Sequence, residues 1–222
     1  MEKENIFIER LTPLYKKERL VTFYKTQKFA DCTFKINGTE VKAHKLILAC
    51  SSPVFEKMFF GEMASSDIII SDINMEEFKQ VLEFIYTENI NITSIVNAWS
   101  LFYIANKYLL DDLIHICLTY IQKNLTMNSL VLSYEYAEMY SLQDIRNKCF
   151  SDIVNYVSGA FSSDYHMKPT TLSAILGKGI ISLDKFELVM QILSWSAIEC
   201  DFRKNSSYSR KHRKCTKGGR YS

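Results

Sequence analysis

The chain has 222 residues and 47% hydrophobic content, enough to bury a core as one domain or as two small ones. Only seven Gly and three Pro are present, which excludes a loop-rich or disordered chain and is typical of a helical protein. The net charge of +2 hides an asymmetry, because eight of the 27 Lys and Arg follow Asp201; residues 1–202 therefore carry 19 basic and 25 acidic side chains, a net charge of −6. An acidic body with a basic tail argues against nucleic acid as the main ligand of the body.

The first predicted element is a helix from Leu11 to Lys28, whose apolar side includes Leu20 and Tyr24. Because this helix precedes every other predicted element, it has no core of its own to pack on before the rest of the chain folds. We therefore expect its apolar side to need a partner surface.

A β-hairpin is predicted next, followed at once by a tight helical corner. Cys32, Phe34 and Ile36 alternate with polar residues, and Asn37-Gly38 suits the two central positions of a type I′ turn. After a short helix, Ser52 can cap a second one that begins with Pro53 at its first position.

Beyond Phe60 a loop leads to a short strand at 68–70, and the apolar spacing is helical from there on. We expect Asn74, Thr93 and Ser141 to act as N-caps, with further helices over 129–139, 170–176 and 183–200. Short links between these helices predict antiparallel pairs.

No catalytic, cofactor or metal site is predicted, so the sequence does not support an enzyme. His44 and Ser51 are seven residues apart, about 10 Å along a regular helix, which is too far for a nucleophile–base pair. A structural His44, bonded inside the fold, is the expectation instead. The four histidines lack zinc-ligand spacing, and there is no P-loop or dinucleotide fingerprint.

The amino terminus has no signal-peptide pattern, and no apolar run approaches the length of a membrane span. The six cysteines stand singly, as expected for reduced thiols in a cytoplasmic protein. The tail after residue 201 is predicted to be disordered, and its basic run Arg210–Lys214 is a possible nuclear-import signal.

The stretch FADCTFKINGTEVKAHKLILACSSPVFEKMFF (29–60) closely resembles the centre of a BTB/POZ domain, and FIYT (84–87) and Ala105-x-Lys107-Tyr108 continue the likeness. The ending FELVMQILSWSAIEC (186–200) resembles the Trp-bearing helix of a BACK domain. The resemblance implies an α+β chain, with a BTB/POZ fold of a small sheet and helical hairpins followed by an all-α, incomplete BACK-like domain. The implied boundaries are an N-terminal segment (1–14), a BTB/POZ domain (15–123), a BACK-like domain (124–201) and the tail (202–222). The pattern is most similar to BTB–BACK proteins that carry a PHR domain, and we expect this chain to be without that domain.

The resemblance also implies a function, that of a dimeric, non-enzymatic substrate adaptor of cullin-3 ubiquitin ligases. In cullin-binding members the loop after the MF pair carries a hydrophobic residue, any residue and then Glu; here Met63 is the hydrophobic residue and Ser65 stands in place of Glu. The candidate cullin contacts are Phe59, Phe60, Met63 and Ser65. The candidate dimer or groove residues are Leu20, Tyr24, Asp31, His44 and Lys45.

Alternatives stay open for several of these residues. Asp31 and Lys45 are equally explained as a pair that pins the hairpin to the following helix, Phe59 as a core residue and Met63 as a loop plug. The alternative function is a BTB protein that dimerises without binding a cullin, either as a regulator of full-length relatives or as a transcriptional co-regulator that binds a peptide in the dimer groove. Ser65 in place of Glu favours it.

Overall fold

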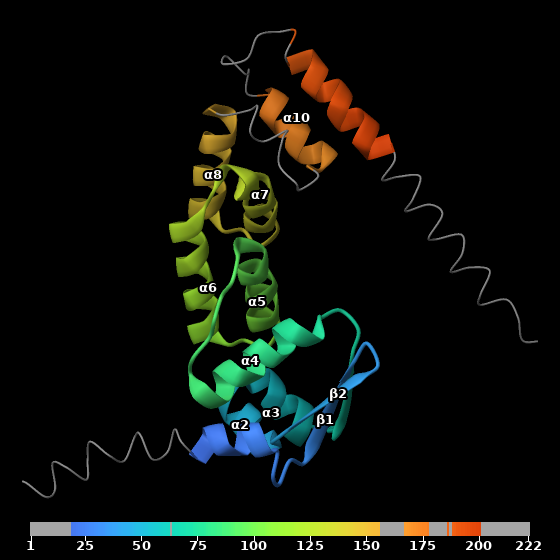
Figure 1. Ribbon diagram of the computed structural model, residues 1–222, viewed down its shortest axis with the longest axis vertical. Helices are drawn as coiled ribbons and strands as arrows, with labels where there is room; N and C mark the ends of the chain where they lie inside the picture. The colour runs from blue at the N-terminus through green and yellow to red at the C-terminus, as the bar shows by residue number, and fades with distance from the viewer. Residues whose placement is uncertain (1–18, 63, 156–166, 178–185, 187, 201–222) are drawn as a thin grey trace, which may run out of the picture. The chain divides into compact units, whose positions relative to one another are not determined.

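The computed structural model describes residues 19–62, 64–155, 167–177, 186 and 188–200 (Figure 1). The chain divides into two compact units, Met1–Asn124 and Leu125–Ser222, called here the N-terminal unit and the helical unit. The N-terminal unit combines a three-stranded sheet with helices, whereas every element described in the helical unit is a helix. The predicted α+β class is confirmed. Within the described ranges, no helix is long and apolar enough to cross a membrane.

The predicted hairpin is confirmed in detail. Strands β1 (Cys32–Ile36) and β2 (Thr39–Ala43) pair antiparallel, with Ile36 opposite Thr39. Asn37 and Gly38 take φ values of 49° and 82°, as a type I′ turn requires. The alternation places Cys32, Phe34 and Ile36 on the buried face.

The helical corner follows directly. Helix α2 (Lys45–Ser51) ends at Ser52, whose hydroxyl accepts a hydrogen bond from the backbone N–H of Phe55 (3.1 Å) at the start of α3 (Pro53–Phe60). The same hydroxyl donates to the carbonyl of Tyr108 (2.5 Å), and its residue is only 1% exposed. Ser52 therefore caps α3 and also ties it to Tyr108, which lies 56 residues further along the chain.

Strand β3 (Asp67–Ile70) pairs parallel to β1, so the sheet order is β2-β1-β3. Figure 1 shows α2, α3 and α4 beside these strands. The core of the unit is aromatic: the Phe34 ring lies 4.8 Å from Phe78 and about 6 Å from Phe55 and Phe59, and Phe55 stacks on Tyr108 (4.3 Å).

The remaining helices of this unit are α4 (Met75–Thr87), α5 (Ile95–Lys107) and α6 (Asp111–Asn124). Asn74 caps α4 as predicted, but the cap of α5 is Ser94 and not Thr93. The hydroxyl of Ser94 accepts from the N–H of Asn97, and this bond fixes where the helix starts. Before the sheet, residues 19–26 are helical; the predicted start of that helix at Leu11 lies outside the described residues.

In the helical unit, a short 3-10 turn η1 (Met127–Ser129) leads into α7 (Leu130–Met139), which packs against α8 (Gln143–Asn155). Helix α8 begins two residues after Ser141, so the predicted cap at Ser141 is wrong; that residue takes φ 57° in the link between the helices. Helix α10 (Pro169–Gly177) and the helical residues 188–200 complete the described part.

A buried carboxylate fastens α10. The side chain of Glu135, 2% exposed, accepts from the backbone N–H of Lys168 (2.7 Å) and the hydroxyl of Thr171 (2.8 Å), and pairs with the Lys168 ammonium (3.1 Å). The indole N–H of Trp195 donates to the carbonyl of Met167 (2.9 Å), which ties helix 188–200 to the same segment.

Candidate interaction surfaces

His44 is a buried structural residue, as expected. Its Nε2 lies 2.7 Å from the carbonyl oxygen of Lys28, which can only accept, so Nε2 carries the proton of the neutral ring. Nδ1 then accepts from the Tyr86 hydroxyl (2.8 Å), and that hydroxyl accepts from the backbone N–H of His44 (3.0 Å). Burial raises the pKa of Tyr86 to about 12, so it stays a donor near neutral pH. Both ring nitrogens are occupied, which leaves His44 no free group for catalysis or for a groove ligand.

This network anchors the helix of residues 19–26. The Phe23 ring lies 5.5 Å from His44, and the Tyr24 ring lies 5.4 Å from Tyr86. Tyr24 and Leu20 are half-buried, and burial raises the pKa of Tyr24. One face of this helix therefore packs against the rest of the N-terminal unit.

Asp31 and Lys45 are close but do not pair through their side chains. The Asp31 carboxylate accepts from the backbone N–H of Lys45 (2.8 Å), which caps the first turn of α2. The Lys45 ammonium reaches instead to the hydroxyl of Ser66 (2.7 Å). The alternative that the two residues pin the hairpin to the following helix therefore holds through Asp31 and the backbone of Lys45, whereas the Lys45 side chain pins α2 to the loop before β3.

Two large apolar side chains are exposed in this part of the domain: Phe29, just after the N-terminal helix, by 84%, and Leu46, in the first turn of α2, by 69%. The Phe29 ring lies 6.5 Å from Phe23, and Leu46 follows His44 by two residues at the start of α2. We call Phe23, Phe29 and Leu46 the apolar N-terminal surface. Sequence reasoning missed its two exposed members, because the apolar run Leu46–Leu48 does not show which residue faces outward.

The candidate cullin contacts separate into different environments. Phe59 is 3% exposed and stacks on Phe55, so it belongs to the core, as the alternative reading held, and offers a partner no surface. Phe60, the last residue of α3, is 59% exposed. Ser65 is exposed, and its hydroxyl donates to the Asp67 carbonyl (3.0 Å) and accepts from the Asp67 N–H (3.3 Å). Met63 lies outside the described residues.

The site has little chemistry beyond hydrogen bonding and apolar contact. Within the part of the chain that the structure describes, no group of three or more His, Cys, Asp or Glu is placed to hold a metal ion. One polar cluster is centred on Asp72, which accepts from the hydroxyl of Tyr103 and pairs with Lys107 (2.7 Å). The hydrogen bond from Lys107, and then that from Tyr103, lowers the pKa of Asp72 below its usual value.

A family model of the BTB/POZ domain matches residues 20–125. These residues are a BTB/POZ domain. The match covers the N-terminal unit from the described helix of residues 19–26 to the end of α6. A BTB/POZ domain is a protein-interaction module, so the exposed residues above are candidate contact surfaces.

Relatives extend the likeness past the BTB domain. The chain is 27% identical over 182 residues to Kelch-like protein 40a of Danio rerio, covering 79% of this chain and 30% of that protein. It is 25% identical over 192 residues to BTB/POZ domain-containing protein 6-A of Danio rerio, and the match covers 83% of this chain and 35% of that protein. It is 31% identical over 134 residues to TD and POZ domain-containing protein 4 of Mus musculus, and the match covers 59% of this chain and 36% of that protein. Among solved structures, the BTB domain of zebrafish PATZ1 aligns with a TM-score of 0.47 and 23% identity, over 52% of this chain and 95% of that one.

The chain spans only about a third of the length of these curated relatives. The relatives include Kelch-like proteins as well as BTB/POZ domain-containing proteins, so they do not single out the predicted PHR type.

Proposed function

We propose that this chain is a non-enzymatic, dimeric adaptor that joins a cullin-3 ubiquitin ligase to a substrate protein. The BTB domain and the Kelch-like relatives support the class of protein. The observation that carries the proposal is the exposure of large apolar residues at two separate places on one BTB domain. Phe29 and Leu46 lie at the N-terminal helix, and Phe60 lies at the end of α3.

In this proposal the apolar N-terminal surface is the dimer contact. An ordinary soluble surface carries scattered apolar residues, but adjacent large ones mark an interaction site. The helix of residues 19–26 covers its own unit through Phe23 and Tyr24 and leaves Phe29 beside it open to a second subunit. Two subunits would then present two cullin contacts, and a bound substrate would gain effective concentration at the ligase.

Oligomeric state tests the dimer. Light scattering coupled to size exclusion should give twice the chain mass of 25.8 kDa. Leu46→Glu should shift the protein to monomer, because it places a charge in the contact. Val96→Glu is the matched control: Val96 is also exposed (63%), but it lies on α5 and should leave the dimer intact. A parent chain that is monomeric at all concentrations would refute this part of the proposal.

The cullin contact is proposed at Phe60, Met63 and Ser65. Buried apolar anchors carry most of the binding energy of protein interfaces, and Phe60 is placed to supply one. Titration calorimetry with the N-terminal domain of cullin-3 tests this directly. Phe60→Ala and Met63→Ala should weaken binding, and Ser65→Glu should strengthen it by restoring the carboxylate of cullin-binding relatives. A folded dimer that shows no heat of binding at tens of micromolar would sink the adaptor function.

A second candidate is a BTB protein that only dimerises, with itself or with longer relatives, and binds no cullin. Ser65 favours it, because its hydroxyl is engaged with the Asp67 backbone and supplies no charge to a partner. Mixing the chain with a full-length relative and measuring exchanged dimers by native mass spectrometry separates the two functions. Exchange without cullin binding would select the second.

A further inference from the structure

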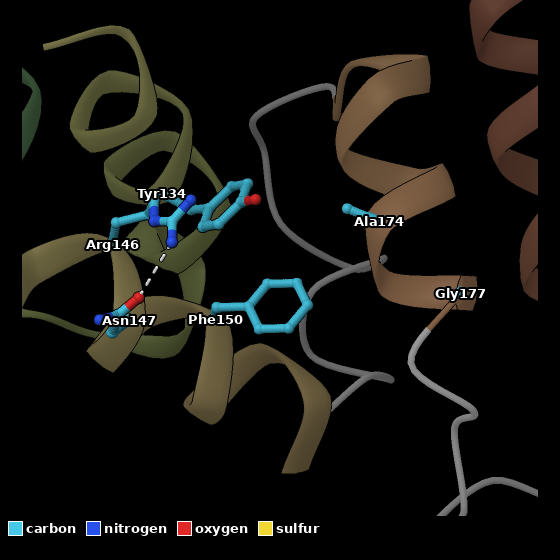
Figure 2. Close-up of a pocket in the computed structure, with 6 residues that line it drawn as sticks. All are labelled: Tyr134, Arg146, Asn147, Phe150, Ala174 and Gly177. Carbon is cyan, nitrogen blue, oxygen red and sulfur yellow. Dashed lines mark hydrogen bonds between the residues drawn. The ribbon is translucent and has the colours of Figure 1, made fainter. Parts of the chain in front are cut away.

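A cavity of about 460 Å³ lies in the helical unit, between the pair α7–α8 and helix α10 (Figure 2). Its volume falls within the usual range for ligand pockets, about 300–1,000 Å³. The cavity is lined by residues outside the matched BTB range, and none of the described lining residues is among those discussed for dimerisation or cullin binding. Its lining residues are Tyr134, Arg146, Asn147, Phe150, Ala174 and Gly177.

One part of the cavity suits an apolar side chain. The rings of Tyr134 and Phe150 lie 5.5 Å apart with an interplanar angle of 36°, and Figure 2 shows Phe150 pointing from α8 toward α10. The facing wall is made of the small residues Ala174 and Gly177. A Cβ atom placed on Gly177 would meet no atom within 4 Å, so there is open space on that side.

The wall formed by α8 carries a cation. Arg146 donates from Nη1 to Glu138 (3.1 Å) and from Nη2 to the side-chain oxygen of Asn147 (3.3 Å). A guanidinium has five N–H groups, so three donors remain beyond these two contacts. No carboxylate is among the described lining residues, and the Glu138 carboxylate takes up only one of the five N–H groups of Arg146.

The opposite wall carries hydrogen-bond acceptors. Gly177 is the last residue of α10, and the final carbonyl groups of a helix have no partner within it and carry partial negative charge. The described residues in the last turn of α10 include no basic side chain. The described lining thus offers a guanidinium on α8, carbonyl groups at the end of α10 and two aromatic rings.

We propose that this cavity binds a peptide segment that places an apolar side chain beside a carboxylate. The carboxylate pairs with Arg146, a charge-assisted contact that suits the planar guanidinium. The apolar side chain enters between Phe150 and Ala174, and peptide N–H groups donate to the last carbonyls of α10. An inorganic anion would leave the aromatic side unused, and an apolar molecule would leave Arg146 without a new partner. The site requires neither dimerisation nor cullin binding, so it goes beyond the proposed function.

Three probe peptides, added to the full-length ¹⁵N-labelled chain, test this by NMR. The first is acetyl-Gly-Gly-Gly-Leu with a free terminal carboxylate, the second is the same peptide amidated, and the third is acetyl-Gly-Asp-Leu-Gly-amide. We expect saturable shifts of the Asn147, Ala174 and Gly177 amides with the first or the third peptide. The amidated peptide should bind at least about tenfold more weakly, because it lacks the charged hydrogen bond. Binding by the first peptide alone assigns a chain terminus, and binding by the third alone assigns an internal acidic residue.

Variants locate the site. Ala174→Leu fills the cavity and should abolish the shifts at Asn147 and Gly177. Ser173→Leu is the matched control, since Ser173 is exposed on the same helix and is not among the lining residues. Arg146→Gln should remove the difference between the acid and the amide. Binding of the amidated peptide as tight as that of the tighter-binding acidic peptide would overturn the proposal, and so would unchanged binding by Ala174→Leu. So would the absence of any saturable shift at about 10 mM peptide.

Discussion

Replacing Ser52 by Ala should destabilise the BTB domain much more than the neighbouring change Ser51→Ala. The Ser52 hydroxyl holds two bonds at a position that is 1% exposed: it accepts from the Phe55 N–H and donates to the Tyr108 carbonyl. Loss of an N-cap costs about 1 kcal/mol. Loss of a second, buried hydrogen bond costs about 1–3 kcal/mol, because the remaining partner stays desolvated. We therefore expect the free energy of unfolding to fall by about 2–4 kcal/mol.

Ser51 provides the control. Its exposed hydroxyl donates to the carbonyl of Ile47 within its own helix (2.9 Å), so Ser51→Ala should change stability by no more than about 0.5 kcal/mol. Each variant loses one serine hydroxyl, and the two serines are neighbours in the chain. The two hydroxyl groups differ in their exposure and in the hydrogen bonds that they make.

Urea unfolding followed by tryptophan fluorescence measures the difference. The buried Trp99 reports on the BTB domain, and a Trp195→Phe background removes the signal of the helical unit. The chain concentration must be constant, because dimerisation would shift the midpoint. A Ser52→Ala midpoint equal to that of Ser51→Ala, at an unchanged slope, would refute the reasoning.

Three further outcomes are expected. Glu135→Ala should destabilise the helical unit by about 3 kcal/mol, because it removes the acceptor of the Lys168 N–H and of the buried Thr171 hydroxyl; amide hydrogen exchange at Lys168 measures this. The lowered pKa of Asp72 means that its carboxylate stabilises the fold above about pH 4 and loses this effect as pH falls further. Asp72→Asn should thus cost up to about 1 kcal/mol at pH 7 in urea unfolding, with the deficit shrinking below pH 4. Burial raises the pKa of three thiols to about 12, so iodoacetamide should modify them only after unfolding, as mapped by mass spectrometry: Cys32, Cys117 and Cys149.

Each of these has an internal comparison. Glu138→Ala removes an exposed carboxylate one turn after Glu135 and should cost under about 1 kcal/mol; an equal loss in both variants would contradict the role of Glu135. A deficit of Asp72→Asn that is the same at pH 7 and pH 3 would exclude its carboxylate as the cause. The exposed thiols of Cys50 and Cys200 should react in the native chain, and equal labelling of Cys117 would contradict its burial.

The local elements of the BTB domain could be predicted because their signals lie within a few residues. Asn37-Gly38 specifies the turn through its φ angles, and Ser52-Pro53 starts a helix through a cap and a fixed proline. The misplaced caps at Thr93 and Ser141 show the limit of the same reasoning. Several polar residues near a helix start can serve as caps, and the one used depends on where the following helix packs.

The partners of the polar side chains required the fold. Asp31 and Lys45 are a plausible ion pair in the sequence, yet one bonds to a backbone N–H and the other to Ser66, 21 residues further on. Nothing in the sequence around Glu135 marks it as buried, because its hydrogen-bond donors lie far along the chain. Lys168, just before α10, is 33 residues away, and Thr171, on α10, is 36 residues away.

The sequence by itself determined the family, the hairpin, the helical corner and the stripes of the main helices, since turn chemistry and hydrophobic period are local properties. Only the tertiary structure decided which neighbouring aromatic residue is a core residue and which is a surface anchor. Phe59 and Phe60 are adjacent and chemically identical, but about 100° of helical rotation separates their side chains. The ring of Phe34, brought near α3 by the sheet, is one of those that bury Phe59, whereas Phe60 is left exposed to solvent.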